Sequence, residues 1–137
     1  MIEQSAIKEM EAVMLSYLTK DLDKPIGFVH VTYTEDCEDT EPYTAYTLSL
    51  GTCGLTGLKA FEISYDPELK KDAETFTKML AHELIHVMQI LRGDSLDYSK
   101  PYREREHEIE AYGREDEVAT HYLRLKSEKN DVSIMEK

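Results

Sequence analysis

Two histidines, His82 and His86, frame the string HELIH at residues 82–86. Residues four apart lie one turn apart on the same face of a helix, so both imidazoles can reach one metal ion. Glu83, between them, is then placed beside the open position of the ion, where it can take a proton from a bound water. A metal lowers the pKa of that water, and a carboxylate completes its activation. The spacing therefore predicts a hydrolytic metal site.

The helix that must carry this site is predicted over residues 72–92, with Asp72 as its N-cap and Gly93 as its stop. Its apolar stripe, at helical spacing, comprises Phe76, Leu80, Leu84, Val87 and Leu91. Glu83 lies at the edge of this apolar stripe, and the two histidines lie directly beside the stripe. A carboxylate that faces inward is costly unless it is paired. This setting favours a functional site over a surface helix with incidental histidines.

The third ligand decides the class of metal site. A metzincin extension needs Gly at position 89 and His at position 92, where this chain has Gln89 and Arg92, so that class is excluded. The alternative is a glutamate from a following helix. Glu108 lies 22 residues after His86 (108 − 86 = 22), across a loop long enough for an antiparallel return.

Two glutamates of that later helix compete for this role. Residues two apart on a helix point about 200° away from each other, so only one of Glu108 and Glu110 can face the ion. Glu108 lies on the less charged face, with Ala111 and Tyr112, whereas Glu110 shares a charged, solvated face. The pattern favours Glu108. Ile109 is also inward and lies between the two, so Glu110 stays an alternative.

Several segments together resemble small gluzincin-like zinc metallopeptidases of phage and bacterial type, sometimes described as SprT-like. They are LAHELIHVMQ at residues 80–89, RGD at 92–94, EIEAYGRE at 108–115 and the strand FEI at 61–63. The resemblance covers roughly residues 50–125. The two helical motifs are specific in combination, and each alone is moderately so.

The resemblance implies that His82 and His86 are zinc ligands and that Glu83 is the catalytic base of a peptidase. In wider gluzincin families the third ligand lies three residues before an alanine, which selects Glu108 before Ala111. The implied activity is hydrolysis of a peptide bond through a zinc-bound water that Glu83 activates.

The chain departs from the pattern of these families at one supporting position. They often have Asp or Asn directly after the alanine, where this chain has Tyr112. Tyr98 and Tyr102 stand at positions where the phage-type group is expected to have Trp. Any of these three tyrosines could stabilise the oxyanion, and the sequence does not select one.

Other candidate ligands are weaker. His30, His107 and His121 are expected to lie at the surface or to make polar contacts rather than to bind metal. Cys53 raises the alternative of a peptide deformylase, whose metal is held by a cysteine and the two histidines of the same helical motif. A zinc-binding regulatory module without catalysis is the other alternative. Cys37 and Cys53 are too few for a disulfide scaffold, and whether they pair is left open.

Six elements must position these residues. Periodicity predicts, in order, a helix over 2–19, strands over 26–33, 43–50 and 58–65, and helices over 72–92 and 103–129, with 35–42 as a loop. The second strand groups Thr44, Tyr46, Leu48 and Leu50 on one face, and the third places Phe61, Ile63 and Tyr65 toward the core. The prediction is one α+β domain over residues 1–137. It is a minimal zincin-like domain, in which the first helix and a small three-stranded sheet pack on the two metal-bearing helices.

Charge and hydropathy limit the partners. The net charge is −12, because the chain has 16 basic and 28 acidic residues. Nucleic acid and anionic membranes both require a basic surface, so neither is expected to bind directly. No apolar run approaches the roughly 20 residues of a membrane span, and the N-terminus lacks the pattern of a signal peptide. We expect a monomer in the cytoplasm of a bacterial or phage-infected cell, acting on a peptide or protein substrate.

Overall fold

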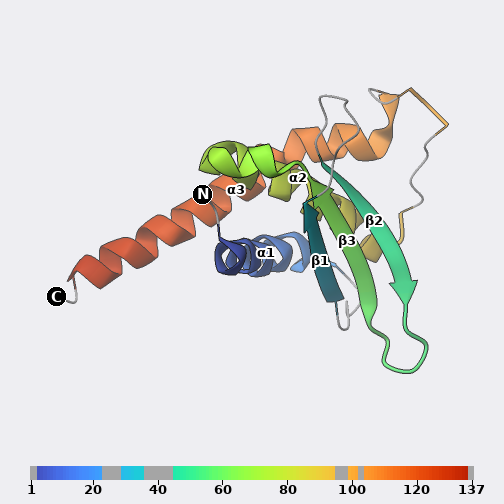
Figure 1. Cartoon of the computed structure of the whole chain (residues 1–137), viewed down its shortest axis with the longest axis horizontal. Coiled ribbons are helices and arrows are strands. Elements are labelled where there is room, and N and C mark those ends of the chain that lie inside the picture. Colours follow the sequence, from blue (N-terminus) through green and yellow to red (C-terminus); the bar gives the residue numbers. More distant parts are fainter. Residues whose placement is uncertain (1–2, 23–28, 36–44, 95–98, 102–103, 136–137) are drawn as a thin grey trace.

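The computed structural model of the chain describes residues 3–22, 29–35, 45–94, 99–101 and 104–135, with side chains in the last segment described as far as residue 128. Its elements are α1 (Gln4–Thr19), β1 (Val29–Glu35), β2 (Ala45–Thr52), β3 (Lys59–Tyr65), the 3₁₀ helix η1 (Pro67–Lys71), α2 (Ala73–Arg92) and α3 (Glu106–Met135). The fold is α+β, and the helices and strands follow the predicted order (Figure 1).

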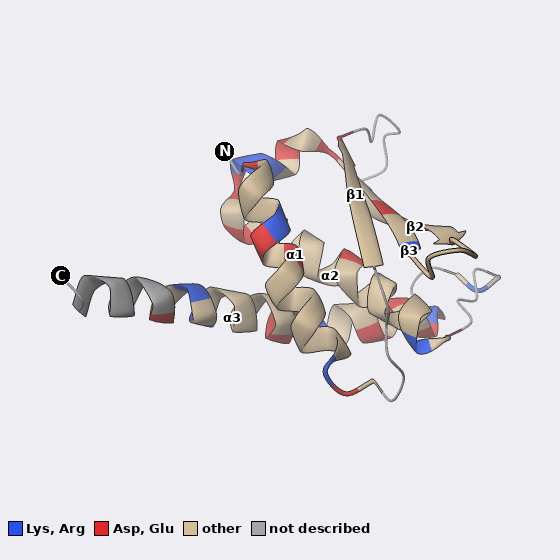
Figure 2. Ribbon diagram, turned by 90° about the horizontal axis from the view of Figure 1, so that it is seen from below, with Lys and Arg blue, Asp and Glu red and all other residues tan. Residues whose placement is uncertain are grey.

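The three strands form one mixed sheet in the order β1-β3-β2. The central strand β3 pairs in parallel with β1, where Val31 lies opposite Phe61. It pairs antiparallel with β2, where Thr47 lies opposite Ile63. The helices gather on one side of this sheet (Figure 2). This pairing, which the sequence did not predict, makes β2 an edge strand, and α2 packs against it.

The core lies between the sheet and the helices. Phe61, Ile63 and Tyr65 of β3 are buried, as the alternation predicts. The ring of Tyr65 meets the ring of Phe76 from α2 edge-on, with centroids 5.3 Å apart. Edge-to-face packing of this kind suits the quadrupoles of two aromatic rings. Helix α1 also contributes to the core, through the buried side chains of Ile7, Met10, Met14, Leu15 and Leu18.

The apolar face of β2 is on the outer side of the sheet. Tyr46 and Leu48 share one face, as the alternation predicts, and are exposed by 47% and 45%. Leu50 is 57% exposed and lies at a register shift between Ser49 and Gly51, where the alternation is interrupted. Thr44, predicted on the same face, lies outside the described residues. The opposite face, with Ala45 and Thr47, is half-buried and turned toward α2. Small side chains there let the helix approach the strand closely.

Element boundaries differ from the prediction where no strong stop signal exists. Glu35, predicted in a loop, belongs to β1. The last helix begins at Glu106 and continues to Met135, because the sequence after Gly113 contains neither Gly nor Pro to end it. The C-terminal part of α3 extends away from the other elements (Figure 1).

None of the helices in the described part of the chain combines the length and apolarity that crossing a membrane requires.

Both ends of α2 form as predicted. The Asp72 carboxylate accepts hydrogen bonds from the backbone N–H of Glu74 at 3.1 Å and from the hydroxyl of Thr75 at 2.6 Å. The bond from Glu74 satisfies one of the backbone donors that the first turn of a helix leaves unpaired. At the other end Gly93 adopts φ 95°, in the left-handed region. The next N–H, from Asp94, then returns to a carbonyl of the last turn.

Substitution of Gly93 by alanine is expected to lower the free energy of unfolding by about 1 kcal/mol, because an L side chain is strained at this positive φ. Nothing lies within 4 Å of the added Cβ, so the strain acts alone. Urea unfolding measures the loss. Gly54→Ala is the matched control, since Gly54 has open space and no positive φ. Equal stabilities of the two variants would contradict this account of the helix end.

Candidate metal centre

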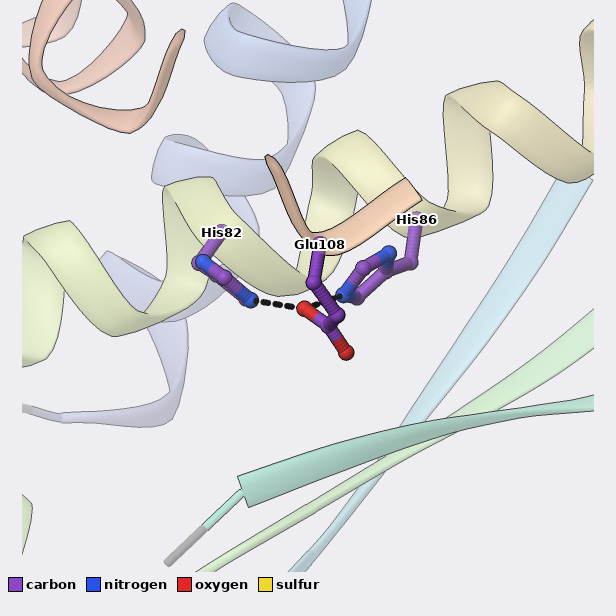
Figure 3. A group of neighbouring side chains, drawn as sticks. All are labelled: His82, His86 and Glu108. Atoms are coloured by element: carbon purple, nitrogen blue, oxygen red, sulfur yellow. Dashed lines mark hydrogen bonds and ion pairs between the residues drawn. The ribbon is translucent and has the colours of Figure 1, made fainter. Parts of the chain in front are cut away.

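Three buried side chains from two helices meet at one point. His82 and His86 come from α2 and Glu108 from α3. Glu108 Oε1 lies 2.9 Å from His82 Nε2 and 3.0 Å from His86 Nε2. Figure 3 shows the carboxylate between the two imidazoles. All three side chains are nearly inaccessible to solvent, so the packing of α2 against α3 builds the group.

This donor set fits a metal ion. One ligand atom from each of the three residues lies within 4.8 Å of the others. Two histidines and one glutamate are a set that catalytic zinc sites use, with a fourth position left for water or substrate. Ligand atoms about 2.0–2.2 Å from a tetrahedral zinc are roughly 3.3–3.5 Å apart. The observed separations of 2.9 and 3.0 Å are therefore a small side-chain shift from that arrangement.

The two imidazoles favour the ionised form of the Glu108 carboxylate, and the carboxylate favours the charged form of His86. Burial raises the pKa of Glu108, but hydrogen bonds from His82 and His86 outweigh burial and hold that pKa well below its ordinary value. Burial lowers the pKa of His86, whereas its contacts with Glu108, Glu83 and Gln89 raise it, and the net shift is upward. Glu108 is thus an ionised carboxylate at neutral pH, as a metal ligand must be.

Glu83 is buried beside this group and is held by the sheet. The Thr47 hydroxyl lies 2.9 Å from Glu83 Oε1, to which it donates, and 3.2 Å from the Glu83 carbonyl oxygen. Burial raises the pKa of Glu83, and the nearby imidazoles of His86 and His82 only partly oppose this. In the described part of the chain, the group that could hold an ion does not include Glu83. The Glu83 carboxylate therefore lies next to the candidate ligands without being one of them.

Tyr112 lies against one of the two histidines of the candidate metal centre. Its ring packs on that of His82, with centroids 4.5 Å apart, and 47% of the residue is exposed. The gluzincin-like families often have Asp or Asn at the position of Tyr112. In this chain a carboxylate near His82 comes from Glu115, whose Oε2 is 3.4 Å from His82 Nδ1. Glu115 is seven residues after Glu108, which is two turns along the same face of a helix. Tyr98 and Tyr102, the other predicted oxyanion candidates, lie outside the described residues.

Glu110 does not join the histidines. The sequence placed it on a solvated face, whereas the structure shows it half-buried, accepting hydrogen bonds from Gln89 Nε2 at 2.8 Å and Arg92 Nη2 at 2.7 Å. The rotation of α3 that brings Glu108 to the histidines directs Glu110 toward the last turn of α2. Glu110, predicted on a solvated face, therefore faces α2, as Glu108 and Glu115 do.

The remaining candidates lie outside the metal group. His107 is buried next to it, with Nε2 3.9 Å from Glu108 Oε2. His30 is exposed on β1, and His121 packs its ring on Tyr17. Cys53 is exposed after β2 and, among the described residues, is not part of the group. Cys37 lies outside the described residues, so the structure leaves open whether the two cysteines pair.

Sequence reasoning missed the supporting residues Gln89, Glu115 and Thr47. Helical spacing contained a signal for two of them, since Gln89 is three residues after His86 and Glu115 is seven after Glu108. It contained none for Thr47, which reaches Glu83 from a strand. Among family models, curated proteins and solved structures, none matches this chain.

Proposed function

We propose that the chain is a zinc-dependent metallopeptidase of the small gluzincin-like, SprT-like type. His82, His86 and Glu108 hold the ion, and Glu83 is the catalytic base. The observation that carries the proposal is the convergence of Glu108 from α3 on both histidines of the α2 motif, within 3.0 Å. The buried carboxylate of Glu83, on the same turn of α2, supplies the further group that hydrolysis requires.

A bound zinc ion would polarise the scissile carbonyl and lower the pKa of a coordinated water. Glu83 would accept the proton of the attacking water and deliver it to the leaving amine. Burial raises the pKa of Glu83, and a carboxylate with a raised pKa is a stronger base toward the attacking water. Thr47 would hold one carboxylate oxygen and leave the other for the proton. Tyr112, which is beside His82 and partly exposed, would be the candidate among the described tyrosines for stabilising the substrate oxyanion.

The donor set favours this activity over the two alternatives. A deformylase-like site needs a cysteine ligand, and Cys53 is exposed and lies outside the group. A zinc-binding module without catalysis has no use for a buried carboxylate next to the ligands, which is costly to maintain. The substrate would be a peptide or protein, bound by a monomer. The net charge of −12 disfavours direct contact with nucleic acid.

Elemental analysis joined to a cleavage assay tests the proposal. The purified wild-type chain should contain about one zinc per chain, and His82→Ala should contain almost none, because a site with two remaining ligands holds zinc weakly. Against a library of unstructured fluorogenic peptides, the zinc-loaded chain should cleave, stop on chelation and resume when zinc is returned.

Each part of this experiment has a distinct contrary outcome. Zinc that remains in His82→Ala would reject the metal site. Cleavage that survives chelation would reject the metallopeptidase. Stoichiometric zinc without cleavage of any peptide would favour the regulatory module.

A further inference from the structure

Gln89 stands directly behind His86. It is fully buried, with 0% exposed, one turn after His86 on α2. Its Oε1 lies 2.8 Å from His86 Nδ1, the ring nitrogen that does not face Glu108. A fully buried glutamine must satisfy both ends of its amide within the protein, so the partners at its other end decide which way it points.

Those partners are both acceptors. Gln89 Nε2 lies 2.9 Å from the carbonyl oxygen of His107 and 2.8 Å from Glu110 Oε1. A backbone carbonyl and a carboxylate cannot donate, so this end of the amide must be its NH₂ group. The opposite end is then the carbonyl oxygen, which can only accept. His86 Nδ1 must therefore carry a proton, and Nε2 is the nitrogen left to face an ion.

The carboxylate that orients the amide is itself fixed. Arg92 donates to Glu110 through Nη2 at 2.7 Å and Nη1 at 3.1 Å. Its Nε donates to Asp94 at 3.1 Å. Asp94 follows the left-handed Gly93, and its own N–H bonds the Gln89 carbonyl oxygen at 3.0 Å. A chain of contacts thus runs from the end of α2, through α3, back to the imidazole. Paired charges of this geometry hold the amide in one orientation.

We propose that Gln89 is a positioning residue of the metal centre, which keeps the proton of His86 on Nδ1 and so presents Nε2 to the ion, while Glu110 and Arg92 orient its amide. This inference rests on the metal site of the proposed function and not on the peptidase reaction. Such supporting hydrogen bonds to metal-binding histidines are typically worth 10- to 100-fold in metal affinity.

Zinc titration against a chromophoric chelator tests the assignment. Gln89→Met keeps the length of the side chain and removes the acceptor, and its zinc affinity should be roughly 10- to 100-fold weaker than that of the wild type. Thr77→Val is the matched control. It also removes a buried polar group of α2, but the Thr77 hydroxyl donates to the carbonyl of Ala73 in its own helix, and among the described residues it has no contact with the candidate ligands. Its affinity should stay within about threefold of the wild type, as expected for a residue without a partner at the ligands.

A second measurement separates positioning from a general loss of stability. In the zinc-loaded chain, the Nδ1 proton of His86 should exchange slowly with water in the wild type and in Thr77→Val, and faster in Gln89→Met. Glu110→Ala covers the case in which Gln89→Met does not fold. It removes one of the two groups that orient the amide, so its affinity should fall several-fold, by less than that of Gln89→Met.

Three outcomes would overturn the inference. They are an unchanged affinity in Gln89→Met, an equal loss in Thr77→Val, or, where Gln89→Met does not fold, an unchanged affinity in Glu110→Ala. Wild-type binding in the same titration distinguishes these from failure of the proposed function. A wild-type chain that does not bind zinc rejects the metal site and the inference with it. A chain that binds zinc tightly but cleaves no peptide rejects only the peptidase.

Discussion

Glu83→Gln should lose nearly all peptide hydrolysis, because a general base typically contributes 10²- to 10⁴-fold to the rate. Its zinc affinity should stay within about threefold of the wild type. The amide has the shape of the carboxylate and can still accept the hydrogen bond from Thr47, so the fold should persist. It cannot accept a proton from water. Because Glu83 lies outside the group of metal-binding atoms, the ion should remain. Initial rates and chelator competition, measured on the same preparation, give the two quantities.

Glu74→Gln is the matched control for this variant. It makes the same chemical change on the same helix, in the exposed first turn of α2, and should leave both the rate and the affinity unchanged. Loss of zinc from Glu83→Gln would show that the carboxylate is a ligand. Retained hydrolysis would show that another group takes the proton.

Glu108→Ala should weaken zinc binding by more than about 100-fold, beyond the loss that removal of a supporting residue causes. In the described part of the chain, the variant removes the candidate ligand that comes from α3 and leaves the Nε2 atoms of two buried imidazoles without the carboxylate between them. Glu110→Ala is the comparison on the same helix. The Glu110 carboxylate contacts Gln89 and Arg92 instead of the histidines, so its affinity should fall by less than about tenfold, through Gln89 alone.

Competition titrations with a chelator of known affinity measure both variants. A larger loss in Glu110→Ala than in Glu108→Ala would reverse the ligand assignment. Equal mild losses would indicate a site with two protein ligands, or one in which the buried His107 takes part. The affinity of His107→Ala would separate these two cases.

What the sequence by itself determined about this protein is local in the chain. The common face of His82 and His86 follows from the pitch of a helix, whatever packs against it. The ends of α2 were predicted correctly because Asp72 caps its own first turn and Gly93 adopts its conformation without help from distant residues. The buried face of β3 followed from alternation, since a central strand covered by helices has one inner side.

Only the tertiary structure decided which side chains meet the two histidines. The choice between Glu108 and Glu110 depends on the rotation of α3, which its packing against α2 sets and which periodicity left open because Ile109 is apolar as well. Ile109 is in fact 57% exposed. The outward direction of the apolar residues of β2 has a similar origin. A strand has two faces, and the element that packs on the sheet determines which of them is buried.

The supporting contacts depend on tertiary structure for the same reason. Thr47 can hold Glu83 only because β2 pairs at the edge of the sheet nearest α2. Gln89 can orient His86 only because α3 brings Glu110 and the carbonyl of His107 to its amide. A hydrogen bond extends over about 3 Å, so a partner far away in the chain is defined by packing. The local pitch of a helix placed the two histidines, and the packing of α3 and β2 on that helix supplied the other groups that they need.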